Sequence, residues 1–82
     1  MELIEEVKRI IKDALVLGDE VDSLTQDSPL LGAFRELDSV GVMAIVESIE
    51  EQYDLEIDDT EISPEMFETL GALVKTIEIK LD

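Results

Sequence analysis

An aspartate and a serine, Asp38 and Ser39, stand directly before an apolar run in the segment FRELDSVGVM. A serine beside a carboxylate could be a nucleophile, a helix cap, or a group that another enzyme modifies. The chain contains no histidine and no cysteine. Because nothing else here could take the Ser39 proton at neutral pH, a self-sufficient serine hydrolase is excluded, and we expect no catalytic residue. A cap and a modification site both stay open, and the two are compatible.

The composition sets the class of protein. Eighty-two residues form one domain, residues 1–82, because a second hydrophobic core does not fit into this length. The lack of cysteine excludes disulfides and cysteine-ligated zinc. The start of the chain is acidic and amphipathic, unlike a signal peptide, and no apolar run reaches membrane-spanning length. We therefore expect a cytoplasmic protein.

The charge is strongly negative, with 22 acidic and 6 basic residues and a formal net charge of −16. Such a chain is repelled by phosphate backbones and anionic lipids, so we expect neither nucleic acid nor membrane as a partner. From Glu36 to Val74 the chain has no lysine or arginine. Like charges packed this densely disfavour the compact state, and a docking surface for basic partners would give them a role. We also expect raised carboxyl pKa values in residues 47–61, and hence stabilisation by acid.

Apolar residues recur at helical spacing in three stretches of the chain. The first stretch covers residues 2–17, the second covers residues 39–53, and the third follows Thr69, which can cap its start. Gly18 is a suitable stop for the first helix. The positions expected to face inward are Leu3, Ile4, Val7, Ile10, Ile11, Ala14, Leu15, Val42, Ile45, Val46, Ile49, Tyr53, Leu70, Leu73, Val74, Ile77 and Leu81.

A long loop and a short helical turn connect these stretches. Residues 18–38 lack helical periodicity but carry apolar anchors, which predict an ordered loop. Ser63 and Pro64 have the order of a cap and a first helical residue, and Met66 and Phe67 follow. The sequence therefore predicts an all-α fold: a small four-helix bundle of three main helices and one short helix, with a long ordered loop between helices 1 and 2. The loop anchors are Leu24, Leu30, Leu31, Phe34 and Leu37.

Nearly the whole chain resembles the acyl carrier protein family. The resemblance covers the first helix, the loop with DSPLL, the segment LDSVGVMAIVESIEEQYDLEIDD, the Ser-Pro turn and FETLGALVKTIE. In that family the serine of an Asp-Ser-Leu motif receives a 4′-phosphopantetheine arm from coenzyme A, and Ser39 and Asp38 match that serine and aspartate. The resemblance implies a carrier, not an enzyme: acyl groups travel as thioesters on the arm, and other enzymes act on them.

The second helix adds a docking surface to this resemblance. A phosphodiester on Ser39 would sit where the unpaired amides and the dipole of a helix start favour negative charge. The implied partners of a monomeric carrier are a phosphopantetheinyl transferase and acyl-transferring enzymes with basic surfaces. We expect apolar contacts near Ser39 and charge steering further along the helix. The expected docking residues are Val40, Met43, Glu47, Glu50, Glu51 and Asp54.

The motif also departs from that of fatty-acid carriers. Val40 replaces the usual leucine, and Gly41 and Ala44 stand where acidic residues are usual. The chain is similar to discrete carriers of specialised pathways, such as those associated with bacterial exosortase and surface-polysaccharide systems. Two alternatives stay open. One is a peptidyl carrier with the same arm and another cargo, and the other is an unmodified acidic helical adaptor.

Four acidic residues have the spacing of positions one, three, five and twelve of a calcium-binding loop. Position six, which needs a glycine, is Asp59, and Pro64 begins a different turn. We therefore expect no metal site, only weak divalent binding to the acidic block, the stretch from Glu36 to Val74 that has no lysine or arginine. The four residues are Asp54, Glu56, Asp58 and Glu65.

Overall fold

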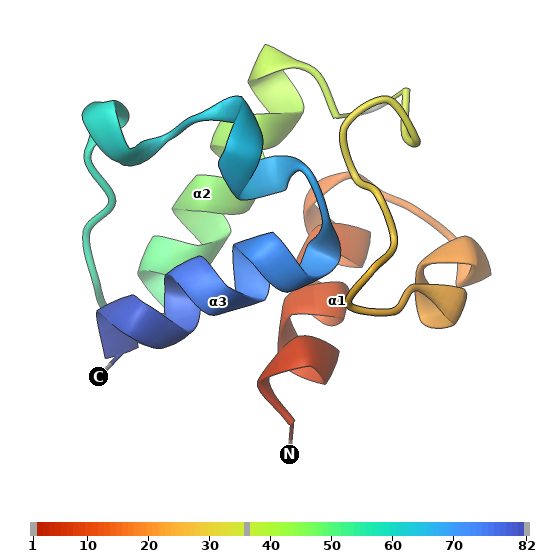
Figure 1. Ribbon diagram of the computed structural model, residues 1–82, viewed down its shortest axis with the longest axis horizontal. Helices are drawn as coiled ribbons and strands as arrows, with labels where there is room; N and C mark the ends of the chain where they lie inside the picture. The colour runs from red at the N-terminus through yellow and green to blue at the C-terminus, as the bar shows by residue number, and fades with distance from the viewer. Residues whose placement is uncertain (1, 36, 82) are drawn as a thin grey trace.

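The computed structural model describes residues 2–35 and 37–81 of the chain, so Glu36 of the acidic block lies outside the described residues. The main helices are α1 (Leu3–Ala14), α2 (Ser39–Tyr53) and α3 (Leu70–Leu81), and α1 packs against both α2 and α3 (Figure 1). Short 3₁₀ turns lie in the connections: η1 (Asp19–Ser23), η2 (Asp59–Glu61) and η3 (Pro64–Phe67). The all-α prediction is confirmed, and the predicted short helix is the 3₁₀ turn η3. Within the described ranges, no helix has the length and apolar character of a membrane span.

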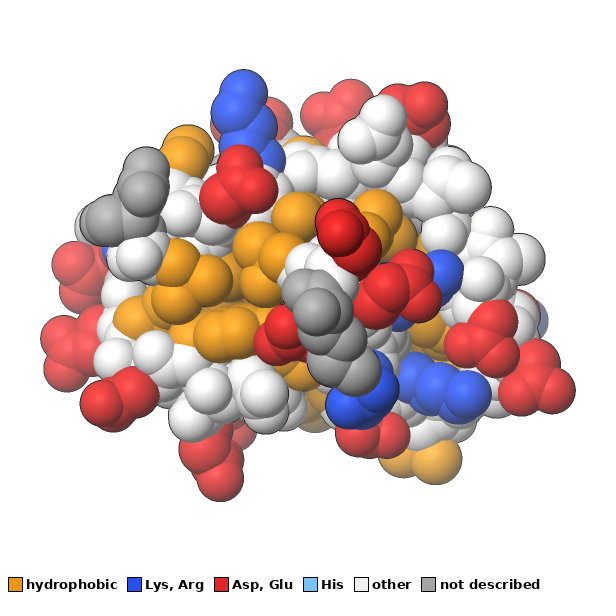
Figure 2. All heavy atoms as spheres, turned by 90° about the horizontal axis from the view of Figure 1, so that it is seen from below, with side chains coloured by type: hydrophobic (Ala, Val, Ile, Leu, Met, Phe, Trp, Pro, Cys, Tyr) orange, Lys and Arg blue, Asp and Glu red, His pale blue; other side chains and the backbone are white. Residues whose placement is uncertain are grey.

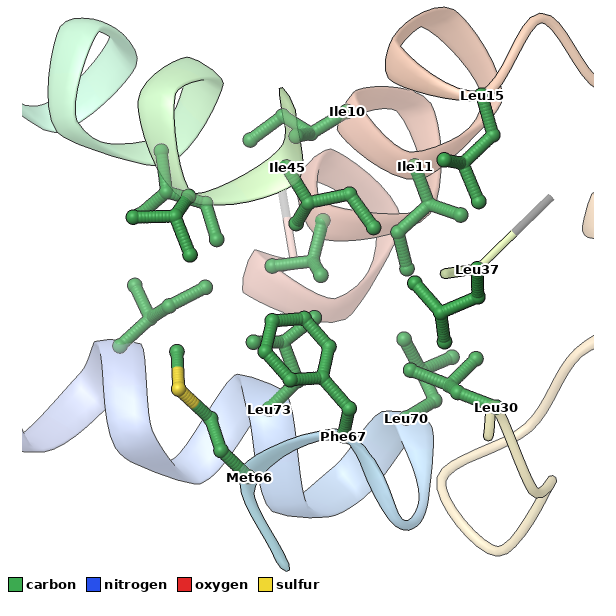
Figure 3. Close-up of a cluster of buried hydrophobic side chains, with 14 of the residues drawn as sticks. Ile10, Ile11, Leu15, Leu30, Leu37, Ile45, Met66, Phe67, Leu70 and Leu73 are labelled. Atoms are coloured by element: carbon green, nitrogen blue, oxygen red, sulfur yellow. The ribbon is translucent and has the colours of Figure 1, made fainter. Parts of the chain in front are cut away.

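Side chains from the three helices, η3 and the long loop meet in one core. Figure 3 shows residues of α1, α2, α3, η3 and the long loop pointing into the same cluster. Phe67 lies at the centre of this core and is 1% exposed. The loop contributes Leu30 and Leu37 as buried anchors. The inward prediction is wrong for Leu81, which is 47% exposed in the last turn of α3. Leu31 is also exposed, because its neighbour Leu30 takes the place in the core.

The end of α1 differs from the sequence prediction. The helix ends at Ala14, and Val16 adopts the left-handed conformation with φ of 54°. The amide of Leu17 then donates to the carbonyl of Lys12 at 2.9 Å, the pattern of a helix end that usually uses glycine at the position of Val16. Gly18 has φ of −97°, so its predicted role as the stop is wrong. Leu15 is buried and Leu17 packs against the core. Because the left-handed turn at Val16 lies between them, both side chains can reach the core.

The long loop is ordered because it pairs with the start of α3 (Figure 1). The first amides of a helix have no partner within the helix. Here Leu70 donates to the carbonyl of Ser28 at 3.0 Å, and Gly71 donates to the carbonyl of Gln26 at 2.8 Å. A methyl group at position 71 would lie 2.7 Å from that carbonyl oxygen, so the close approach requires glycine. The predicted cap at Thr69 is confirmed, since its hydroxyl accepts from the amide of Ala72 at 3.1 Å.

Basic side chains are placed beside carboxylates. Figure 2 shows acidic side chains around the edge of the lower face, with small groups of basic side chains next to them. On α1, Lys12 lies 3.9 Å from Asp19 and 3.8 Å from Asp22, and Lys8 donates to the carbonyl of Asp22 at 2.9 Å. Exposed ion pairs of this kind contribute about 0–1 kcal/mol each, so they orient the η1 segment more than they stabilise the fold.

One ion pair ties the connection between α2 and α3 to the end of α3. Lys80 lies 2.5 Å from a carboxylate oxygen of Glu61, whose other oxygen accepts from the amide of Asp58 at 2.9 Å. The hydrogen bond from Lys80, and next the one from Asp58, lower the pKa of Glu61. The expected rise in pKa is therefore wrong for this residue. A carboxyl with a lowered pKa stabilises the fold above its unfolded pKa, and acid removes that stabilisation as the pH falls through the lowered value.

A hydrogen bond between Tyr53 and Glu6 joins the end of α2 to the start of α1 at 3.1 Å. Burial, then the hydrogen bond to Glu6 and its charge, raise the pKa of Tyr53 to about 12. Because Tyr53 is the only tyrosine and tryptophan is absent, the ultraviolet absorbance of phenolate reports on this residue alone. We predict a titration midpoint near 12. The contribution of protonated Tyr53 to the stability of the fold should be complete below its unfolded pKa of about 10. It should be lost as the pH rises through the folded pKa.

Two variants test the cause of this shift. Glu6→Gln should bring the phenolate midpoint closer to the ordinary value, because it removes the neighbouring charge. Glu5→Gln, on the same helix turn, should leave the midpoint unchanged. Circular dichroism recorded in the same titration establishes that the chain is folded. A wild-type midpoint near 10, the ordinary pKa of tyrosine, would contradict the interaction.

Candidate functional site

Asp38 is the cap of α2, and Ser39 is its first residue. A carboxylate oxygen of Asp38 accepts from the amide of Gly41 at 2.9 Å, and its carbonyl accepts from the amide of Val42 at 2.8 Å. Ser39 is exposed, and the first turn of α2 contains no acidic side chain. The two residues therefore divide the roles that the sequence left open, with Asp38 starting the helix and Ser39 presenting its hydroxyl to solvent.

The start of α2 is suited to a negatively charged group on Ser39. The first amides of a helix lack partners within it, and the helix dipole adds positive potential at this end. Of the residues that the structure describes, Asp38 alone caps the first turn with its side chain, which accepts from the amide of Gly41. The residues present thus fit a phosphodiester attached to the serine hydroxyl, since solvent access and the local field both favour it.

An apolar groove of about 420 Å³ opens beside Ser39, between α2 and the connection that leads to η3. Its apolar surface far exceeds its polar surface, whereas other hollows, such as the one at Asp13 and Ser48 between α1 and α2, are more polar. The groove could hold an extended apolar group that starts at Ser39. The described residues that line it are Leu31, Leu37, Asp38, Ser39, Val42, Met43, Ile62, Ser63, Pro64 and Phe67.

Sequence reasoning predicted Asp38, Ser39 and Met43 as site residues but not the rest of this lining. One signal was present for Leu31: it follows Leu30, and neighbouring residues of a loop rarely face the same core. Ile62 and Ser63 gave no signal, because they come close to Ser39 only through the return of the chain after α2. The groove is a product of the tertiary fold.

Most of the predicted docking residues share an exposed face of α2. Val40 is 78% exposed and Met43 is 43% exposed, and Glu47 and Glu51 follow them at spacings of three or four residues. Residues at these spacings lie on one side of a helix. Asp54 is exposed at the C-terminal end, in the left-handed conformation with φ of 52°. The face therefore runs from an apolar end at Val40 to an acidic end at Asp54.

Glu50 differs from the other acidic residues of α2. It is half-buried, and its carboxylate accepts from the amide of Ile57 at 2.9 Å. Ile57 is buried, so this bond fixes the chain as it leaves the helix. In residues 2–35 and 37–81, acidic side chains are nowhere gathered in threes so as to hold a metal ion.

Comparisons with known proteins show a family and a solved structure to which this chain is similar. Residues 5–77 match the family described as "Phosphopantetheine attachment site". The fold is similar to that of a holo acyl carrier protein from Nitrosomonas europaea, determined in solution by NMR, with a TM-score of 0.90 and 44% sequence identity. That match covers 99% of this chain and 98% of the other. Both matches extend over the start of α2, the groove and the acidic end of the helix.

The contrast between Glu50 and Glu51 is testable. We predict that Glu50→Ala lowers the free energy of unfolding by about 1–2 kcal/mol, because the amide of Ile57 loses its acceptor. Glu51→Ala, on the exposed face, should change it by less than about 0.5 kcal/mol. Glu50→Gln keeps an acceptor oxygen and should recover most of the loss. Urea denaturation followed by circular dichroism measures all three, and equal effects of the two alanine variants would contradict a structural role for Glu50.

Proposed function

The chain belongs to the phosphopantetheine-binding carrier family, and we propose that Ser39 is the residue to which its arm is attached. It is an acyl carrier protein and not an enzyme. When bound, the arm supplies a thiol that holds acyl groups as thioesters. The chain itself presents the attachment point, shelters the cargo and is recognised by the enzymes that act on it.

The observation that supports Ser39 is its position between a cap and a groove. The carboxylate of Asp38 caps the helix by accepting a hydrogen bond from the amide of Gly41 at 2.9 Å. Ser39, the next residue, is exposed to solvent. A transferase can reach such a hydroxyl without unfolding the helix. The adjoining groove then offers an apolar surface within reach of whatever is attached there.

The lining of the groove favours an acyl cargo over a peptidyl one. Its side chains are mostly aliphatic or aromatic, with few polar groups. Burying an aliphatic chain there contributes about 0.8 kcal/mol per methylene group, whereas burying peptide groups without partners is costly. The groove thus supports an acyl carrier whose cargo is at least partly apolar.

We further propose that the exposed face of α2 docks the phosphopantetheinyl transferase and acyl-processing enzymes. Asp54 lies about 22 Å from Ser39 along the helix, at 1.5 Å per residue, so one enzyme can contact the whole face. Residues 39–46 include Gly41 and Ala44 and contain no ionisable side chain, so the first turns carry no charge. Partners that suit this face should offer apolar contacts near Ser39 and basic groups further along. This combination is consistent with a specialised pathway, such as the bacterial exosortase and surface-polysaccharide systems whose carriers the chain resembles.

The attachment site is tested by intact mass. We predict that the wild-type chain, co-expressed with a broad-specificity phosphopantetheinyl transferase, gains the mass of one phosphopantetheinyl group. Ser39→Ala should abolish the gain, because no hydroxyl remains at the start of α2. Ser48→Ala, a serine variant further along the same helix, should keep it. If the wild type stays unmodified with several competent transferases, the chain is instead an unmodified acidic adaptor.

The docking face is tested by binding kinetics with the transferase. Replacing Glu47 and Glu51 together by lysine should slow association by about tenfold at low salt and flatten its salt dependence, because steering is lost. Asp27→Lys combined with Glu78→Lys makes the same change in net charge away from α2 and should have a much smaller effect.

Val40→Asp should act differently, mainly through faster dissociation, because it removes a short-range apolar contact. Circular dichroism must show that each variant is folded. If the Glu47 and Glu51 variant binds with an unchanged salt slope, the acidic end of α2 does not contact the partner.

A further inference from the structure

Ser63 occupies the position of a helix cap but does not act as one. It precedes Pro64 at the start of η3, and the sequence predicts that its hydroxyl caps the turn. In the structure its side chain makes no capping hydrogen bond, and its backbone carbonyl accepts from the amide of Met66 at 3.1 Å. The hydroxyl of Thr69, by contrast, does bond to the start of its own helix. The hydroxyl of Ser63 is therefore not used to hold the turn.

Ser63 belongs to the lining of the groove beside Ser39. Among the described residues that line the groove, three have polar side chains: Asp38, Ser39 and Ser63. Asp38 is committed to the amide of Gly41, and Ser39 is the proposed attachment point. Of the lining residues, Ser63 is thus the one whose polar group is available to something lying in the groove.

We propose that Ser63 is a positioning residue that hydrogen-bonds an amide of the phosphopantetheine arm and lays the arm along the groove. This inference rests on the proposed attachment at Ser39. A pantetheine chain alternates short aliphatic segments with two amides and ends in a thiol. Its aliphatic segments suit the apolar walls, but an amide placed there without a partner would be strongly disfavoured. A serine hydroxyl both donates and accepts, so it can satisfy either the N–H or the carbonyl of such an amide.

The surrounding contacts hold the backbone at Ser63 in place. Met66 and Phe67 are 4% and 1% exposed, so η3 is anchored in the core directly after Ser63. On the other side, Glu61 is bound to Lys80 and to the amide of Asp58. A group fixed from both sides loses little conformational freedom when it binds, which favours an ordered position of the arm. In the resting carrier the arm should then be partly shielded along the groove.

The reactivity of the arm's thiol tests this proposal directly. The chain has no cysteine, so in the arm-bearing protein the thiol of the arm is the only one present. We expect Ser63→Ala to speed alkylation of this thiol by iodoacetamide about threefold to tenfold, the effect of one lost hydrogen bond. Ser63→Thr keeps the hydroxyl and should react at nearly the wild-type rate. Ser48→Ala, away from the groove, should react like the wild type.

Two further measurements separate positioning from structure. The arm-free Ser63→Ala protein should unfold at the same urea concentration as the wild type, because the hydroxyl makes no capping bond. Amide NMR shifts at residues 62–67 should change on attachment of the arm in the wild type and much less in Ser63→Ala. Equal alkylation rates, or a clear loss of stability in the arm-free variant, would overturn the positioning role.

Intact mass distinguishes this failure from that of the proposed function. A wild-type chain that never accepts the arm refutes attachment and positioning together. A chain that accepts the arm at Ser39 but reacts equally with and without the Ser63 hydroxyl refutes only the positioning role.

Discussion

The hydrogen bond from the amide of Gly41 to the carboxylate of Asp38 determines where α2 begins, and the site depends on that point. Leu37, just before the cap, is buried, and Val42 packs against the core one turn later. An apolar pair at these two positions fixes the direction in which a chain enters a helix. With the entry fixed on both sides of the cap, Ser39 has one orientation, outward and next to the groove. A cap shifted by one residue would rotate the serine by about 100° around the helix axis.

The parts of the fold that local chemistry decides could be predicted from the sequence. The range of α2 is the predicted one, because a capping aspartate and a regular apolar stripe agree there. The end of α1 could not be predicted, since the burial of Leu15 and Leu17 outweighs the preference of a left-handed position for glycine. The groove could not be predicted from the sequence either, because Ile62 and Ser63 come close to α2 only after the chain has turned back. Ser63 is the clearest case. Its sequence context predicts a helix cap, but in the fold its side chain makes no capping hydrogen bond and the residue lines the groove.

Acidic residues that look equivalent in the sequence have different roles in the fold. Glu50 binds a backbone amide of the connection after α2, and Glu61 binds Lys80. Glu47 and Glu51 instead face solvent. Carboxylates with specific partners stabilise the fold, whereas solvated ones mainly add to the repulsion of a chain with a net charge of −16. A count of charges cannot separate these classes, because the partners come from distant parts of the chain.

The exposed apolar surface at the start of α2 has a cost for the isolated chain. Each Å² of apolar surface left in water forgoes about 25 cal/mol, and a chain of this size has a small core from which to recover it. Val40 and Met43 nevertheless stay exposed beside Ser39 and the open groove. An apolar group that covered this surface would gain the stabilisation that folding left unused. Under the proposed function, the order along α2 separates two tasks: short-range apolar contacts lie at the proposed attachment point, and longer-range attraction by Glu47 and Glu51 lies further along the same helix.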